Sequence, residues 1–91
     1  MKRYVIERDL PGVGSLSRAQ LKDLAATSNA ALAKLLGKVQ WVQSFIADDK
    51  SFCIYLADSE ASVYEHSRLA GFPVTRITEA RTVIDPMTEF S

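Results

Sequence analysis

Residues 39–57, VQWVQSFIADDKSFCIYLA, predict two antiparallel strands joined by a tight turn. Both flanks are rich in β-branched and aromatic residues, which favour extended backbone. The segment between them, Asp48-Asp49-Lys50, is short and polar, as is typical of a hairpin turn. We therefore expect strands over Val39–Ala47 and Ser51–Ala57, side by side in one sheet.

A first helix is predicted before this hairpin, over Arg18–Leu36. Ser17 and Gln20 have the spacing of a capping box, in which each side chain accepts a hydrogen bond from the other residue's backbone N–H. Apolar side chains then recur every three or four residues, as on one face of a helix. Gly37 follows at a position where glycine commonly ends a helix.

A second helix and two outer strands complete the pattern. The helix begins near Asp58 or Ser59 and ends at Ala70, because Gly71-Phe72-Pro73 cannot continue it. The outer strands are expected over Arg3–Asp9 and Arg76–Asp85. The order β-α-β-β-α-β predicts an α+β ferredoxin-like sandwich, with one four-stranded antiparallel sheet and both helices on one face.

Composition limits the class of protein. Ninety-one residues predict a single domain over residues 1–91, with residues 86–91 as a flexible tail. Eleven basic and eleven acidic side chains cancel, so we expect neither a nucleic-acid partner nor an anionic membrane partner. No apolar stretch approaches the roughly 20 residues that span a bilayer. One cysteine allows no internal disulfide, which favours a cytoplasmic location.

The predicted sheet carries apolar residues on both faces. Strict alternation in the second strand places Trp41 and Phe45 on one face, and Val42 and Ile46 on the other. Helices cover only one face of this fold, and a second apolar face also needs a cover. We therefore expect a symmetric homodimer that pairs through the open sheet face, a dimeric α/β barrel.

His66 is the only histidine and the first candidate for chemistry. It shares a helical face with Val63 and Ala70, so the imidazole is expected to point inward. It is either a core residue bonded to a carbonyl or to a hydroxyl such as that of Ser62, or a metal ligand or general base. Its helix offers no second ligand at the required spacing, so any further ligand must come from another element.

Cys53 and Glu7 are the candidates behind His66. Cys53 lies within a strand and is either a small buried apolar residue or a soft ligand for a transition metal. Because the first and third strands are adjacent in this fold, Glu7 is expected to share a face with Cys53 and Tyr55. Glu7 then forms an ion pair with Arg81 or Arg76, or acts as a ligand or base in a dimer cavity.

Four further residues are candidates for lining a ligand pocket. Ser28 lies on the apolar stripe of the first helix, and Asn29 flanks it. Both bond to the preceding helical turn, or both line a polar pocket beneath the helices. Trp41 and Tyr55 are large enough to form the walls of such a pocket, although aromatic residues within strands commonly belong to the core.

Several phrases together resemble a known family of small bacterial proteins. They are Thr27-Ser28-Asn29, Val39-Gln40-Trp41-Val42-Gln43-Ser44, Asp49-Lys50-Ser51-Phe52-Cys53-Ile54-Tyr55, Glu65-His66, Ala70-Gly71-Phe72-Pro73 and Ile84-Asp85-Pro86. This family has long been catalogued as a domain of unknown function, and one actinobacterial member is described as nickel-binding. The resemblance, which extends from Tyr4 to Thr88, implies a ferredoxin-like fold paired into a dimeric α/β barrel.

The sequence is compatible with three functions. The first is a small cytosolic homodimer that binds a divalent transition metal such as nickel, or a small ligand, with His66, Cys53 and Glu7 as metal contacts and no organic cofactor. The second is a cofactor-independent, monooxygenase- or isomerase-like enzyme in which His66 is the general base. The third is a structural or regulatory module, because a fold alone does not determine a function.

Overall fold

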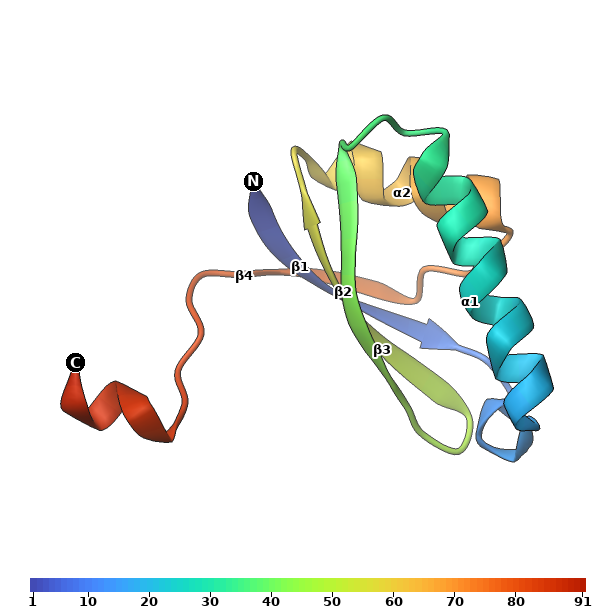
Figure 1. Ribbon diagram of the computed structural model, residues 1–91, viewed down its shortest axis with the longest axis horizontal. Helices are drawn as coiled ribbons and strands as arrows, with labels where there is room; N and C mark the ends of the chain where they lie inside the picture. Colours follow the sequence, from blue (N-terminus) through green and yellow to red (C-terminus); the bar gives the residue numbers. More distant parts are fainter.

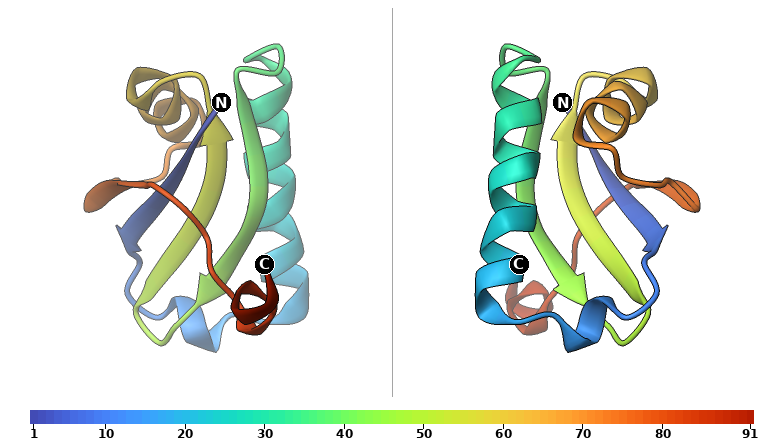
Figure 2. Two further views of the ribbon diagram at one scale, coloured as in Figure 1. Left: turned by 90° about the vertical axis from the view of Figure 1, so that its left-hand side faces the viewer. Right: turned by 90° about the vertical axis from the view of Figure 1, so that its right-hand side faces the viewer.

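The computed structural model describes residues 1–91 and confirms the predicted ferredoxin-like fold (Figure 1). The main elements are β1 (Lys2–Asp9), α1 (Arg18–Ala33), β2 (Val39–Ile46), β3 (Lys50–Ala57), α2 (Glu60–Ala70) and β4 (Arg76–Ala80). Two short 3-10 helices, η1 (Val13–Ser15) and η2 (Pro86–Phe90), complete the chain. The strands form one antiparallel sheet in the order β2-β3-β1-β4, and both helices lie on the same face (Figure 2).

The predicted capping box begins α1. Ser17 Oγ accepts a hydrogen bond from Gln20 N at 3.2 Å, and Gln20 Oε1 accepts one from Ser17 N at 2.9 Å. The helix ends at Ala33 instead of Leu36, so its predicted end was wrong. Leu36 has φ 51° and Gly37 has φ 83°, and two successive left-handed residues turn the chain toward β2.

The second helix begins and ends close to the prediction. Ser59 accepts a hydrogen bond from Ser62 N at 3.2 Å and so caps α2. At its other end Gly71 adopts φ 76°, a left-handed conformation that favours glycine. The amide N–H of Phe72 then donates to the carbonyl of Ser67 at 2.9 Å, which closes the end of the helix.

The fourth strand is shorter than predicted. It ends at Ala80 instead of Asp85, because β1 is its only neighbour and Ala80 pairs with Arg3 near the beginning of β1. Residues 81–91 leave the sheet and lie on the side away from the helices (Figure 1). The segment expected as a tail contains η2, which Asp85 and Thr88 cap. We call residues 81–91 the C-terminal arm.

A β-bulge changes the facing of β2. The register with β3 shifts between Trp41, which pairs with Tyr55, and Gln43, which pairs with Ile54. The extra residue, Val42, interrupts strict alternation, so Trp41 faces the helices but Phe45 does not. The prediction that these two aromatic residues share a face was therefore wrong.

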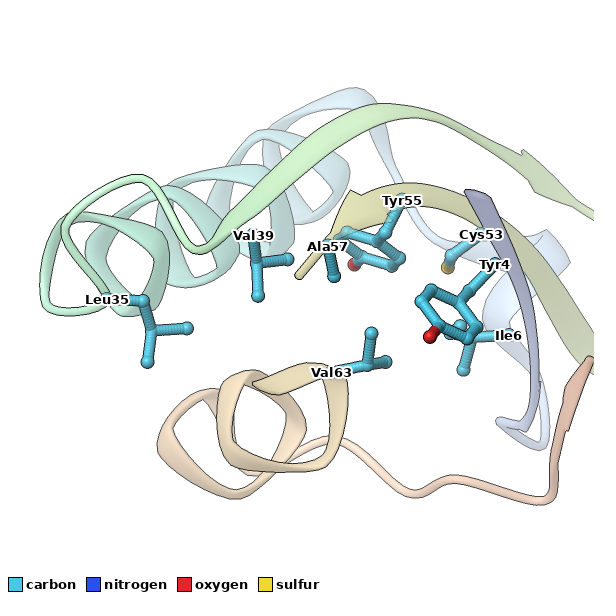
Figure 3. Packing of buried hydrophobic residues seen from close by; sticks show 8 residues of the cluster. All are labelled: Tyr4, Ile6, Leu35, Val39, Cys53, Tyr55, Ala57 and Val63. Carbon is cyan, nitrogen blue, oxygen red and sulfur yellow. The ribbon is translucent and has the colours of Figure 1, made fainter. Parts of the chain in front are cut away.

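The core lies between the sheet and the helices (Figure 3). Its buried members are Tyr4, Ile6, Leu35, Val39, Cys53, Tyr55, Ala57 and Val63. The other sheet face, which we call the open face, carries Val5, Phe45, Phe52, Ile54 and Leu56. These side chains are half-buried or exposed, since no element of the chain covers them. None of the helices combines the length and apolar character needed to cross a membrane.

Candidate functional site

A cavity of about 170 Å³ lies between α1 and the helix-facing side of β2 and β3. The first helix contributes Leu21, Leu24, Ala25 and Ser28 to its wall, and β2 contributes Trp41, Ser44 and Ile46. The β-bulge is what allows all three β2 residues to face the cavity. The wall is largely apolar, as in a site that binds the apolar part of a small molecule.

One charged residue, Arg8, lines this cavity. Its side chain is 1% exposed, although arginine is rarely buried without a paired carboxylate. Nη1 donates to Ser67 Oγ at 3.0 Å and to the carbonyl oxygen of Pro73 at 2.7 Å. Nε and Nη2 are buried and have no partner within the protein. The guanidinium therefore carries an uncompensated charge beside the cavity.

Two aromatic rings surround the guanidinium of Arg8. Its Cζ lies 5.3 Å from the ring centroid of Phe72 and 5.9 Å from that of Tyr55. Such cation–π contacts offset part of the cost of burying a charge, about 0.5–2 kcal/mol each. They do not replace hydrogen bonds, so the Nε and Nη2 donors remain unsatisfied.

His66 is fully buried behind the cavity wall and not on it. Its Nε2 lies 3.2 Å from Ser28 Oγ, and Nδ1 has no partner. The hydroxyl partner is thus Ser28 of α1 and not Ser62, which instead bonds to Ser59 and Asp58 at the start of α2. Burial lowers the pKa of His66 and the nearby charge of Arg8 lowers it further, so the imidazole is neutral at pH 7.

Tyr55 lies between the imidazole and the guanidinium. Its ring centroid is 5.0 Å from that of His66, and both residues belong to the buried layer beneath the helices. Burial raises the pKa of the Tyr55 phenol, so the hydroxyl stays protonated and available as a donor.

The predicted placement of Glu7 beside Cys53 was wrong. Ile6 pairs with Cys53 while Glu7 pairs with Phe52, so Glu7 lies on the open face and Cys53 faces the helices. The ion-pair partner of Glu7 is Lys50, at 2.7 Å, and not Arg76 or Arg81. This hydrogen bond and the charge of Glu7 raise the pKa of the Lys50 amine.

The residues of one chain do not form a metal site. Glu7 lies on the opposite sheet face from Cys53, and the imidazole of His66 bonds to Ser28. Nowhere do three His, Cys, Asp or Glu side chains gather as metal ligands would. Nickel bound by nitrogen, sulfur or oxygen donors requires several of them around one point, and a single chain does not provide that arrangement.

Three of the four predicted pocket residues line the cavity: Ser28, Trp41 and Tyr55. Asn29 is exposed and lies off the wall, because one helical step of about 100° turns it away from Ser28. Arg8 was not among the site residues predicted from the sequence. The signal for it was alternation in β1, where Tyr4, Ile6 and Arg8 all face the helices.

Fold and site together define an α+β ferredoxin-like protein with a buried arginine at the wall of an apolar cavity. The chain belongs to the SCO4226-like family, whose model, described as "Nickel responsive protein SCO4226-like", matches residues 4–80. A crystal structure of SCO4226 from Streptomyces coelicolor A3(2) matches with a TM-score of 0.75 at 16% identity, covering 90% of this chain and 99% of that one. No curated protein matches the chain. The resemblance drawn from short sequence phrases is thereby confirmed for family and fold.

Proposed function

We propose that the protein is a small cytoplasmic binding protein that acts as a homodimer and binds a divalent transition metal, with nickel as the first candidate. The observation that carries the dimer is the open face. Phe45 is 54% exposed there, beside the half-buried Phe52, Ile54 and Leu56. A contiguous apolar surface of this kind is typical of an interface, and a second open face of the same composition is complementary to it.

The C-terminal arm supports the same pairing. Val83, Ile84, Met87 and Phe90 are between 61% and 76% exposed, and the arm lies on the open side of the sheet (Figure 2). Within one chain these side chains pack against nothing that buries them. Laid against a second copy, they would lose their exposed apolar area, which stabilises the dimer by about 25 cal/mol per Å² buried.

The metal part of the proposal rests on the family description, which names nickel responsiveness. Because one chain gathers no metal-ligand cluster, we propose that the ligands come from both copies. Of the three candidate ligands, Glu7 alone lies on the open face, where the partner would approach. Cys53 faces the helices, and His66 lies on α2 with its imidazole fully buried.

Light scattering after size exclusion tests the dimer. Two variants are compared, each of which replaces an aromatic residue with aspartate, one on the open face and one on the opposite side of the molecule. Phe45→Asp introduces a charge on the open face, whereas Tyr64→Asp introduces one on α2, where Tyr64 is 47% exposed. We expect a dimer for the unaltered protein and for Tyr64→Asp, and a monomer for Phe45→Asp. A monomer of unaltered protein at tens of micromolar would contradict the proposal.

Calorimetry with nickel, zinc and copper on tag-free protein tests the shared metal site. We expect stoichiometric nickel binding by the dimer, loss of binding in the monomeric Phe45→Asp protein, and full binding in His66→Gln. Undiminished nickel binding by the monomeric variant would exclude a shared site. Loss of nickel binding in His66→Gln would show that His66 is one of the nickel ligands.

A second candidate function has one observation in its favour. Ser28 Oγ lines the cavity and lies 3.2 Å from His66 Nε2, so the imidazole reaches a ligand only through this hydroxyl. In a cofactor-independent enzyme His66 would be the general base for Ser28 or for a substrate atom that replaces it. A fluorophosphonate tests this function. Labelling of Ser28, in which fluoride leaves and the hydroxyl proton passes to His66, would support it if the His66→Gln variant is not labelled. If Ser28 is not labelled, it does not act as a nucleophile.

A further inference from the structure

We propose that the cavity binds a small monocarboxylate with an apolar body, and that the free edge of Arg8 holds its carboxylate. Nε and Nη2 are the two donors on one side of the guanidinium, and they can bond to both oxygens of a carboxylate in parallel. Both atoms are buried without a partner. This site is separate from the open face and does not depend on the dimer or on nickel.

The arginine is already oriented for this role. Nη1 is fixed by Ser67 Oγ on α2 and by the Pro73 carbonyl in the loop that follows it. Fixing one end of a guanidinium leaves the opposite edge in a defined direction, which lowers the entropy lost when a ligand binds. The salt bridges of the chain involve other residues, so no internal carboxylate competes for this edge.

The size and chemistry of the wall select the rest of the ligand. A cavity of about 170 Å³ is close to the ~150 Å³ apolar cavity that holds benzene in another protein. Leu21, Leu24, Trp41 and Ile46 supply apolar surface for one six-membered ring or one branched alkyl chain. The ligand class is therefore a benzoate-like or branched-chain acid, not a long or strongly polar molecule.

The charge of the site selects a monoanion. Arg8 is the only cation on the wall, and the neutral His66 behind Ser28 adds no second positive charge. A phosphate dianion carries two negative charges, and Arg8 would pair with only one of them. The second charge would be buried without a partner, which is costly in an apolar surrounding. A carboxylate matches the single guanidinium in charge and in geometry.

Binding requires one side-chain movement, which we assign to Phe72. The Nε and Nη2 atoms are covered, and the Phe72 ring centroid lies 5.3 Å from the Arg8 guanidinium carbon. Phe72 is half-buried, lines the cavity and belongs to the short loop between α2 and β4. Rotation of this ring opens the guanidinium edge to the cavity without a change in the sheet.

The fluorescence of Trp41 measures binding directly, because Trp41 is the only tryptophan and lines the cavity. The probes are benzoate, phenylacetate and 4-methylpentanoate, each compared with its amide. We expect a saturable change in emission with at least one acid and about tenfold weaker binding of its amide, the factor expected for a charge-assisted hydrogen bond. No response to any acid at millimolar concentration, or equal binding of acid and amide, would overturn the proposal.

Two variant comparisons complete the test. Arg8→Met keeps an apolar side chain of similar length and is expected to weaken acid binding about tenfold while leaving amide binding unchanged. Ala25→Leu fills the cavity from α1, whereas the neighbouring Ala26→Leu places the same side chain on the exposed face of that helix. We expect loss of binding only in Ala25→Leu. Equal binding by the two leucine variants would show that the acid binds elsewhere, and this pair decides the matter even if Arg8→Met fails to fold.

Discussion

The hydroxyl of Ser28 on α1 lies 3.2 Å from the imidazole of His66 on α2, and this hydrogen bond joins the two helices across the buried layer. It is the only side-chain bond between them and lies next to the cavity. Burial keeps the imidazole neutral, and the imidazole is hydrogen-bonded to a residue that lines the cavity.

The stability of the fold is expected to fall as the pH drops below about 6.5. Burial lowers the pKa of His66 below its ordinary value of 6.5, so the unfolded chain takes up a proton at a pH where the folded chain does not. The stabilisation is complete above pH 6.5 and is lost as the pH falls toward the folded pKa. Urea denaturation between pH 7.5 and 5.5 measures this slope.

His66→Gln removes the titrating group from that measurement. Glutamine can also bond to Ser28 but does not titrate in this range, so the slope is expected to flatten. Asp58 and Glu65 also have lowered pKa values, from hydrogen bonds to Ser62 and Arg68, but their effects fall below pH 4.5. An unchanged slope in His66→Gln would mean that His66 is not the source of the pH dependence.

Arg8→Met is expected to raise the free energy of unfolding by about 1 kcal/mol, because replacing a buried unpaired charge with an apolar residue is often stabilising. The gain is limited by the two hydrogen bonds that Nη1 loses. Guanidinium denaturation measures the difference, with the exposed Arg76→Met as the control that should change little. Destabilisation by more than about 2 kcal/mol would instead show that Arg8 mainly fastens the Pro73 loop to β1.

Gly14→Ala is expected to destabilise the fold by at least about 2 kcal/mol. A Cβ on Gly14 would lie 2.7 Å from Ala47 O and from Asp48 Cα, both of them backbone atoms of the β2–β3 turn. Gly12→Ala is the comparison, because it meets nothing within 4 Å and loses only the left-handed preference of glycine, about 1 kcal/mol. Equal midpoints in urea for the two variants would contradict the close approach.

Removal of the C-terminal arm, residues 81–91, is expected to weaken self-association at least about tenfold, since burying even one large apolar side chain contributes about 1.5–3 kcal/mol. Far-UV circular dichroism should show the sheet and the helices α1 and α2 intact, because the arm contains only the short η2. Analytical ultracentrifugation measures the dissociation constant. An unchanged constant would exclude the arm from the interface.

Local sequence signals were sufficient for most of the fold. Capping at Ser17, the glycine at position 71 and the alternation in β3 each depend on residues close in sequence. The end of β4 depends instead on where its partner β1 begins, which no residue of β4 reveals. The bulge at Val42 has no glycine to signal it, so periodicity alone assigned the wrong face to Phe45.

The site was harder to predict than the fold. Alternation in β1 places Arg8 on the same face as Tyr4 and Ile6, but a charged side chain is ordinarily solvated, so the residue type does not indicate that this arginine is buried. The bond between Ser28 and His66 joins residues 38 positions apart, so only the packing of α1 against α2 brings them together. Glu7 was misplaced because the β1–β3 register sets it opposite Phe52 and not Cys53.

The bulge in β2 also determines which single residue of this strand can be deleted without changing the direction of the side chains that follow. An in-frame deletion of Val42 would restore regular pairing and leave Ser44 and Ile46 opposite the same β3 partners. A deletion of Ser44 would instead move each later side chain of β2 to the other face of the sheet. Phe45 would then point into the cavity and Ile46 would point outward. Two deletions only two residues apart would thus have opposite consequences: the first would be tolerated, and the second would close the cavity and remove the aromatic side chain from the open face.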